Sequence, residues 1–295
     1  MDFLRPATWP DALAAKAEHP SAVPIAGGTD VMVELNFDHR RPTALLDLTG
    51  VAELAEWGDV DGRVRIGAGL PYTRLIAELG GRLPGLAMAS RTVGSPQIRN
   101  RGTVGGNLGT SSPAGDAHPP LLACDAVVEV ESVRGNRLIP ATEFYLGVKR
   151  NALAPDELIA AVHVAPAGGP QQFAKVGTRN AMVIAVCAFG LCLEPAEGRV
   201  GAAVGSAAPT PRRATAAEEF LAGELAEHGW WGSPSPELPD SMVRRFGELV
   251  ASAADPIDDV RGTAAYRRHA LAVLARRTLG WAWRDYRKGS WQACA

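Results

Sequence analysis

RGTVGGNLGTSSPAGD, at residues 101–116, is the stretch that decides the expected fold. Thr103 and Val104 are β-branched and are predicted to end a strand, after which a glycine pair leaves the backbone uncovered. Pro113 is expected to begin a helix that continues through Leu122. Uncovered N–H groups and a helix start attract anions, and glycine permits the positive φ of tight loops. The stretch therefore predicts either a phosphate or pyrophosphate pocket or an ordinary glycine-rich turn, because a single loop of this kind is a weak signal.

A second glycine-rich stretch, PIAGGTDVMVE at residues 24–34, shows the same order of features. A short apolar strand at residues 23–26 leads into a glycine pair. Thr29 or Asp30 can then cap a helix that begins at Val31. Two loops of this kind in one chain favour a ligand with two phosphates, or a long dinucleotide that is held at several points.

Five motifs in order carry a family resemblance. AGGTD at residues 26–30 and TVGGNLGTSSPAGD at residues 103–116 resemble the FAD-binding medium subunit of the molybdenum hydroxylases. This family includes xanthine dehydrogenases, carbon monoxide dehydrogenases and related enzymes that oxidise aldehydes or N-heterocycles. QIRNRG at residues 97–102, FAKVGTRNAMVIAV at residues 173–186 and PIDDVRGTAAYRRH at residues 256–269 also look like the family. The resemblance covers nearly the whole chain and is far more specific than one loop.

The resemblance implies an α+β fold, in which a PCMH-type FAD-binding domain of two subdomains precedes a small antiparallel sheet with C-terminal helices. We place the FAD-binding domain at residues 1–175, with subdomains at about 1–57 and 58–175. A C-terminal domain of the molybdenum-hydroxylase flavoprotein type is expected at residues 176–295. The order of the expected elements agrees with this fold, since a mixed region is followed by strands and then by helices.

The resemblance also implies which residues bind the cofactor. The implied FAD-binding residues are Ile25, Ala26, Gly27, Gly28, Thr29, Asp30, Val31, Thr103, Gly106, Asn107, Thr110, Asp116, Ile159 and Lys175. Asp116 matches the family's acid that hydrogen-bonds FAD, and a helix-start cap is its alternative role. Lys175 is expected beside the flavin ring, where a cation stabilises the reduced form, rather than on the surface of an edge strand. No residue of the chain is assigned as catalytic or as a metal ligand.

By the same resemblance, the chain is the FAD-binding subunit of a molybdenum hydroxylase, and a xanthine dehydrogenase-like enzyme is favoured. Its implied partners are a large molybdopterin-binding subunit with the molybdenum cofactor and a small [2Fe–2S] subunit, assembled as a dimer of heterotrimers. Electrons then leave through FAD to NAD⁺, with oxygen or a quinone as alternative acceptors. Two other functions stay open: a stand-alone FAD-dependent oxidase and a non-catalytic nucleotide-binding module.

Composition and cysteine spacing argue against several other classes. The net charge of −2 and a pI near 6.3 give no electrostatic case for nucleic acid. No apolar run approaches the roughly 20 residues of a membrane-spanning helix, and the N-terminus lacks a signal-peptide pattern, so a cytoplasmic location is expected. Four cysteines occur without a C-x-x-C pair, which argues against a disulfide or metal site. Cys187 and Cys192 lie in one strand-like run and are expected to face opposite sides.

Periodicity predicts the order of the elements. Helices are expected at residues 11–17, 30–37, 83–91, 119–123, 215–221, 239–252 and 263–277, and strands at residues 43–48, 64–66, 126–131, 137–140, 156–164, 173–178, 182–194 and 199–206. The turn-rich segment at residues 57–62 is expected to separate two subdomains. GAGLPYTRLIAEL at residues 67–79 imitates a Rossmann fingerprint but lacks its third glycine, so we favour a structural turn there.

Three further features have two interpretations each. We expect His118 to be a partly exposed loop histidine, although it lies close to the predicted pocket. Arg99 and Arg101 can orient a phosphate or can be surface cations. The loop at residues 229–239 contains two adjacent tryptophans and is predicted to contact another chain. The alternative is that both tryptophans fold back onto their own domain.

Overall fold

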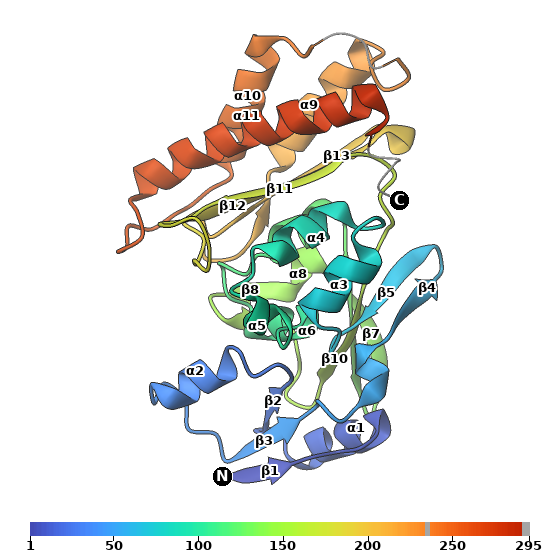
Figure 1. Ribbon diagram of the computed structural model, residues 1–295, viewed down its shortest axis with the longest axis vertical. Helices are drawn as coiled ribbons and strands as arrows, with labels where there is room; N and C mark the ends of the chain where they lie inside the picture. Colours follow the sequence, from blue (N-terminus) through green and yellow to red (C-terminus); the bar gives the residue numbers. More distant parts are fainter. Residues whose placement is uncertain (234–236, 291–295) are drawn as a thin grey trace.

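The structure is a computed structural model that describes residues 1–233 and 237–290, and it has three layers along its long axis (Figure 1). A small parallel sheet with two helices lies at one end, and a five-stranded sheet with short helices occupies the middle. A four-stranded sheet covered by three longer helices forms the other end. The predicted α+β class, with C-terminal helices on a small antiparallel sheet, is confirmed. Among the described residues, no helix is both long enough and apolar enough to span a membrane.

The first layer is a parallel sheet in the order β1-β3-β2, with β1 at Asp2–Leu4, β2 at Val23–Ile25 and β3 at Ala44–Asp47. Helix α1 (Trp9–Glu18) begins where the Thr8 hydroxyl accepts a hydrogen bond from the Asp11 N–H. One face of α1 is buried against the layers beside it. Helix α2 (Val31–Asn36) has no buried residue and lies exposed at one edge of the molecule (Figure 1).

The middle layer is an antiparallel sheet in the order β4-β5-β10-β6-β7. Its strands are β4 (Trp57–Val60), β5 (Arg63–Gly67), β6 (Val127–Ser132), β7 (Gly135–Pro140) and β10 (Leu158–Val164). The 3₁₀ turn η1 (Ala52–Ala55) precedes the helices α3 (Tyr72–Leu79), α4 (Pro84–Arg91), α5 (Pro96–Arg99), α6 (Val104–Thr110), α7 (His118–Ala123) and α8 (Ala141–Phe144), and the hairpin of β8 (Tyr145–Gly147) and β9 (Arg150–Asn151) follows them. Alternate residues of β6 are buried, including Val128 and Val130, because one face of the sheet packs against the core.

The third layer is an antiparallel sheet in the order β11-β12-β13-β14 beneath three helices (Figure 1). Its elements are β11 (Gln171–Val176), β12 (Cys187–Glu194), η2 (Pro195–Glu197), β13 (Arg199–Gly205), β14 (Arg212–Arg213), α9 (Thr215–Glu227), α10 (Asp240–Ser252) and α11 (Ala264–Lys288). One face of β12 meets the helices, where the Phe189 and Phe246 ring centroids lie 6.2 Å apart. The other face of the sheet meets α7 so closely that a Cβ on Gly201 would lie 1.8 Å from the Ala123 carbonyl oxygen. Glycine at this position therefore allows the middle and third layers to pack together.

The structure corrects the prediction for the start of the glycine-rich stretch at residues 101–116. Thr103 and Val104 do not end a strand, because Thr103 is the N-cap of α6. Its hydroxyl accepts the N–H of Gly106 at 2.9 Å. A cap of this kind satisfies a donor that every helix start leaves free, and here it outweighs the strand preference of two β-branched residues.

The helix predicted to begin at Pro113 begins instead at His118. Residues 112–116 form turns, in which the N–H of Gly115 donates to the Ser112 carbonyl at 3.0 Å. Proline can occupy a turn as readily as the first position of a helix, so Pro113 alone does not locate the helix start.

Two other expected elements differ from the structure. Residues 57–62 are not simply a turn, because β4 occupies Trp57–Val60 and only Asp61 and Gly62 turn back with positive φ. Residues 182–186, predicted to start a strand, precede β12 in an irregular loop.

The predicted domain division at residue 175 falls within β11, while the change from one sheet to the next falls at residues 165–170. The domain limits therefore stay a prediction.

The cysteines of β12 face opposite sides, as predicted. Cys187 belongs to the hydrophobic core beneath the C-terminal helices, and Cys192 belongs to the core of the middle layer. Cys294 lies outside the described residues.

The adjacent tryptophans Trp230 and Trp231 fold back onto their own layer. The Trp230 ring centroid lies 6.2 Å from that of Trp283, and the Trp231 carbonyl accepts a hydrogen bond from the Tyr286 hydroxyl. Both side chains are partly buried against the helices of their own layer, and a contact of this loop with another chain stays a prediction. Residues 234–236 of the same loop lie outside the described residues.

Candidate functional site

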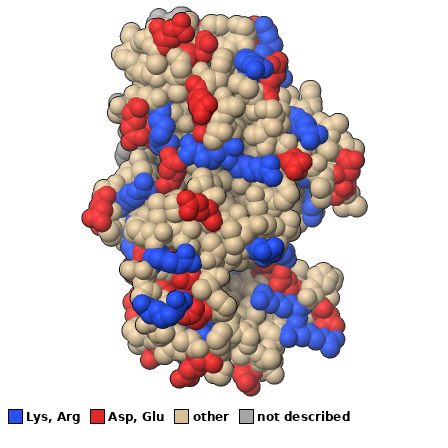
Figure 2. Space-filling model, turned by 180° about the vertical axis from the view of Figure 1, so that it is seen from behind, with Lys and Arg blue, Asp and Glu red and all other residues tan. Residues whose placement is uncertain are grey.

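A cavity of about 800 Å³ is lined by residues of all three layers. Its lining comes mainly from residues 23–31, 68–72, 93–116, 146–159 and 182–184. Figure 2 shows a hollow in the lower half of the molecule, with basic and acidic side chains on its border. The volume lies within the range of about 300–1,000 Å³ that is typical of small-molecule and cofactor sites. The cavity is therefore the candidate functional site.

The first wall is the segment at residues 26–31, which connects β2 to α2. Gly28 has a φ of +74°, a conformation that glycine adopts without strain. A Cβ on Gly27 would lie 1.9 Å from the Arg101 carbonyl oxygen, so this residue packs directly against the opposite segment. The backbone N–H groups of residues 28–30 have no acceptor among the described residues. They are available to a ligand, and successive free N–H groups favour an anion.

The second wall is the segment from the start of helix α6 to Asp116. Gly105 packs so closely on the preceding turn that a Cβ there would lie 2.4 Å from the Ala68 Cβ. Gly106 and Asn107 line the cavity. No glycine of α6 has positive φ, so the role expected for these glycines in a tight loop is wrong. Their absent side chains instead allow close packing on one side of the helix and leave the backbone uncovered on the other.

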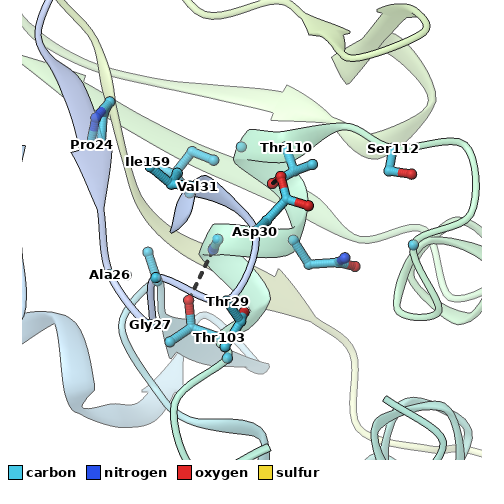
Figure 3. A pocket seen from close by; sticks show the side chains of 18 of the residues that line it. Pro24, Ala26, Gly27, Thr29, Asp30, Val31, Thr103, Thr110, Ser112 and Ile159 are labelled. Carbon is cyan, nitrogen blue, oxygen red and sulfur yellow. Dashed lines mark hydrogen bonds between the residues drawn. The ribbon is translucent and has the colours of Figure 1, made fainter. Parts of the chain in front are cut away.

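The two walls lie side by side at the cavity, where the Asp30 and Thr110 side chains meet (Figure 3). The Thr110 hydroxyl at the end of α6 donates to the Asp30 carboxylate at 3.2 Å. At the start of α6, the Thr103 hydroxyl holds the helix by accepting the Gly106 N–H, shown as the dashed line in Figure 3. Two glycine-rich segments that are far apart in the sequence therefore form one site.

An ion-pair cluster lies at the mouth of the cavity. Lys149, in the turn of the β8–β9 hairpin, lies 2.5 Å from the Glu34 carboxylate on α2, and Arg40 lies 3.7 Å from the same carboxylate. A hydrogen bond from Lys149 holds the pKa of Glu34 below its usual range. All three side chains line the cavity. The ion pair between Lys149 and Glu34 joins the exposed helix α2 to the middle layer.

The inner end of the cavity contains a buried ion pair. The Lys175 ammonium lies 2.6 Å from the Asp116 carboxylate and also donates to the carbonyls of Thr92 at 3.0 Å and Val183 at 3.2 Å. Both charged side chains are 9% exposed. Burial raises the pKa of Asp116, and the Lys175 charge opposes that shift. Lys175 is therefore not a surface lysine, and it joins β11 of the third layer to the wall of the cavity.

His118 is fully buried, so the expectation of a partly exposed loop histidine is wrong. Its Nδ1 lies 2.7 Å from the Tyr145 hydroxyl, and the two rings meet edge to face with centroids 4.8 Å apart. Burial lowers the pKa of His118 to about 3, so the ring is neutral at physiological pH. The sequence missed this because α7 is buried between two layers, a contact that depends on the tertiary packing.

Most of the sequence-predicted site residues meet at the cavity. Ala26, Gly27, Gly28, Thr29, Asp30, Val31, Thr103, Gly106, Asn107, Thr110, Asp116 and Ile159 all line it. Ile25 lies instead on a smaller hollow on the other side of the first wall, together with Arg101. Lys175 lies behind Asp116 and does not line the cavity. Arg99 donates to the carbonyls of Val93 and Gly94, so it supports the chain beside the cavity. The ligand contacts of these residues stay a prediction.

Sequence reasoning missed several lining residues. They are Ala68, Gly69, Tyr72, Leu146, Lys149, Arg150, Met182, Val183 and Ile184. The segment at residues 67–71 is a structural turn, as predicted, yet it also lines the cavity because Pro71 forms a β-bridge with Thr103. The glycine-x-glycine spacing there was a usable signal. The hairpin and loop residues were not predictable, because their positions depend on how the layers pack.

Family models match both parts of the chain. Residues 1–167 match the FAD binding domain in molybdopterin dehydrogenase, and residues 172–282 match the CO dehydrogenase flavoprotein C-terminal domain.

Full-length relatives and solved structures agree with these matches. The chain is 31% identical to a xanthine dehydrogenase FAD-binding subunit of Escherichia coli O157:H7, over 94% of each chain. It is also 31% identical to the nicotine 6-hydroxylase medium subunit of Paenarthrobacter nicotinovorans, over 94% of this chain and 95% of that one. A structure of the Cu,Mo-CO dehydrogenase in its cyanide-inactivated form matches with a TM-score of 0.85 and 26% identity, covering 96% of this chain and 98% of the other.

Proposed function

This chain belongs to the family of FAD-binding subunits of molybdenum hydroxylases, and from that premise we propose that it is the flavoprotein component of a xanthine dehydrogenase-like enzyme. In this proposal, electrons from a molybdenum centre pass through [2Fe–2S] clusters on partner chains to FAD on this chain, and NAD⁺ is the final acceptor. The observation that carries the proposal is the meeting of the two glycine-rich segments as adjoining walls of one cavity.

The residues of the cavity fit FAD. The free N–H groups of residues 28–30 suit a pyrophosphate, and the cavity volume suits a large cofactor. When bound, FAD supplies two-electron redox chemistry, which no side chain of the cavity can supply. The protein binds and orients it: Thr103 fixes the start of α6, and Asp116 presents a carboxylate at the inner end of the cavity.

Lys175 has a role through Asp116 in this proposal. Its ammonium group fixes the carboxylate from behind with one ion pair, while two carbonyls fix the ammonium group itself. The pair as a whole is close to neutral, because the ammonium charge offsets that of the carboxylate in front of it. The lysine therefore orients the carboxylate and offsets its charge.

The proposal includes partner chains. Relatives with similar full-length sequences bear the names medium subunit and medium chain, as in nicotine 6-hydroxylase and in the carbon monoxide dehydrogenase of Afipia carboxidovorans. We therefore propose a large molybdopterin-binding subunit and a small [2Fe–2S] subunit as partners, in a dimer of heterotrimers. In this proposal, the molybdenum centre and the binding site for the substrate that is hydroxylated both lie on a partner chain.

The test is expression of the chain alone and together with candidate large and small subunits. The assembled complex is expected to contain FAD, molybdenum and iron and to reduce NAD⁺ with xanthine, whereas the isolated chain binds FAD and oxidises no purine. A matched complex that carries Gly106→Val is expected to keep its molybdenum and iron but to lose FAD and NAD⁺ reduction.

Two results would contradict the proposal. If the isolated chain oxidises a purine as fast as the complex does, the stand-alone oxidase replaces the subunit. If the complex oxidises another heterocycle or an aldehyde but no purine, the family assignment stands and the xanthine assignment is wrong.

A further inference from the structure

Helix α2 is held at the border of the cavity mainly by polar contacts. Its six residues include none that is buried, and a helix this short is marginal on its own. Among the described residues, two side-chain hydrogen bonds connect residues 30–36 with other segments. One joins Asp30 to Thr110 at the end of α6 at 3.2 Å, and the other joins Glu34 to Lys149 at 2.5 Å. The position of α2 therefore depends on these two contacts.

The β8–β9 hairpin, in contrast, is anchored to the second wall through its backbone and a buried amide contact. The Lys149 N–H donates to the Ser111 carbonyl at 3.1 Å, directly after α6. The Asn151 side-chain amide donates to the Gly109 carbonyl at 3.0 Å and to the Ser111 hydroxyl at 3.2 Å. The Lys149 side chain therefore extends from an anchored hairpin to a helix that has few other contacts.

The backbone of Lys149 has a conformation that lysine rarely adopts. Its φ is +53°, in the left-handed region, where a tight turn usually has glycine or asparagine. A residue in a strained conformation of this kind persists where the surrounding structure compensates for it, and such residues cluster at functional sites. The turn alone favours glycine, whereas the ion pair to α2 requires a long cationic side chain. The lysine is therefore explained by its contact with Glu34 and not by the turn.

The ion pair lies between the cavity and the solvent. Both side chains line the cavity, and those of Lys149 and Glu34 are 50% and 17% exposed. Figure 2 shows basic and acidic side chains together on the border of the hollow. Arg40 contacts the same carboxylate, but it follows α2 in the same segment and does not join the helix to the middle layer. A carboxylate on a cavity whose free N–H groups suit an anion does not itself favour that ligand, so Glu34 requires another role.

We propose that the Lys149–Glu34 ion pair is a latch, which holds α2 against the β8–β9 hairpin and slows the release of the ligand. When the pair breaks, α2 separates from the hairpin, and the first wall moves with it because residues 26–31 lead directly into this helix. Lys149 and Glu34 are therefore positioning residues that act through α2. The latch rests on the proposed function for the identity of the ligand, since FAD is the molecule whose release is measured.

The decisive variant is Glu34→Gln in the full chain, because two possible effects have opposite signs. Removal of a negative charge from the cavity favours an anionic ligand and slows its release, whereas loss of the latch speeds its release. We expect FAD release, followed by flavin fluorescence after dilution, to be about fivefold faster, which is the upper range for a partly exposed ion pair. Release that is unchanged or slower would overturn the latch.

Lys149→Met and the double variant show whether the two side chains act together. We expect Lys149→Met and the double variant each to release FAD about fivefold faster, because either single change already breaks the same pair. A double variant that releases FAD about 25-fold faster, the product of the single effects, would show independent roles and would overturn the latch. Faster release in Lys149→Met with unchanged release in Glu34→Gln would make Lys149 a ligand contact, which also overturns it.

Lys149→Gly tests the latch without a ligand. Glycine suits the positive φ, so the melting temperature of the FAD-free chain is not expected to fall, while the backbone amides of α2 are expected to exchange hydrogen about fivefold faster. The matched control is Asp61→Gly, at a φ of +50° in the turn between β4 and β5 and outside the cavity, which is expected to leave α2 unchanged. Unchanged exchange of α2 in Lys149→Gly would overturn the latch. A wild-type chain that binds no FAD would overturn the proposed function, yet this comparison would still test the latch.

Discussion

The two walls of the cavity differ in how the chain supports them. The first wall, residues 26–31, is partly exposed, leads into a helix with no buried residue and presents free backbone N–H groups. The second wall, from α6 to Asp116, is packed against the core and presents buried side chains with shifted pKa values. We infer that the first wall serves mainly ligand binding, whereas the second wall couples ligand binding to the stability of the whole chain.

The largest expected effect on stability comes from Lys175→Met. This variant leaves the Asp116 carboxylate buried without its countercharge, and breaking a buried ion pair in this way costs about 3–5 kcal/mol. Asp116 then favours its protonated form more strongly, so the variant loses further stability as pH rises through the raised folded-state pKa of this carboxyl. Urea unfolding at several pH values measures the effect. A loss below about 1 kcal/mol would show that the pair adds little to stability. It would contradict the inference that the second wall contributes more to stability than the first.

Gly105→Val tests the packed side of the same wall. Its side chain would meet the Ala68 Cβ and carbonyl oxygen at 2.4 and 2.5 Å, so we expect a loss of about 3 kcal/mol in the free energy of unfolding. Gly223→Val in α9 is the matched control, because a Cβ there meets nothing within 4 Å. The control is expected to change stability by less than about 0.5 kcal/mol. Equal stability of the two variants would mean that α6 can move away from the turn at Ala68.

The pH dependence of stability reports on His118. Its folded-state pKa of about 3 lies below the ordinary value of 6.5, so the unfolded chain binds a proton that the folded chain does not. The stability from this residue is complete above pH 6.5 and is lost as pH falls toward 3, with a slope of at most about 1.4 kcal/mol per pH unit. Comparison of urea unfolding between the wild type and His118→Gln from pH 7 to pH 4 isolates this contribution. Parallel curves would show that His118 is not buried in its neutral form.

The smallest expected change in stability belongs to the first wall. Gly28→Ala places a side chain at a φ of +74°, with atoms of Ile25 and Met32 at 3.5 Å, so the expected loss is about 1 kcal/mol. The same change is expected to weaken FAD binding, because the free N–H groups of this wall depend on that backbone conformation. Thermal unfolding and FAD titration of one preparation separate the two effects. A large loss of stability with unchanged FAD binding would reverse the roles of the two walls.

The sequence predicts the fold where the signals are local. The β2 strand, the start of α2 and the alternating β6 follow from patterns within a few residues, and each is present as expected. The motif pair at residues 26–30 and 103–116 also identified two walls that local patterns could not bring together, because a family resemblance carries tertiary information.

The predictions from the sequence are wrong where a helix cap or the tertiary packing determines the local structure. Thr103 was predicted in a strand because β-branched residues favour strands, but a helix start that needs a cap uses it as one. His118 is expected to be partly exposed because it follows a loop, but α7 packs between the sheet of the third layer and the helices α4 and α8. Lys175 is expected beside the ligand; it lies behind Asp116, and its distance from a bound ligand stays a prediction. The burial of His118 depends on tertiary packing, whereas the Thr103 cap is a local contact with the Gly106 N–H that competes with strand preference.

FAD titration of Gly106→Val is the most direct test of whether α6 presents an uncovered backbone to FAD. A Cβ at this exposed glycine meets only the Thr103 hydroxyl at 3.1 Å, so the variant is expected to fold, while its side chain covers the cavity wall. We predict that Gly106→Val keeps the circular dichroism and the FAD-free melting temperature of the wild type to within about 3 °C and binds FAD at least about a hundredfold more weakly. Gly223→Val, outside the cavity, is predicted to bind FAD like the wild type. A folded Gly106→Val chain with wild-type FAD affinity would contradict the claim.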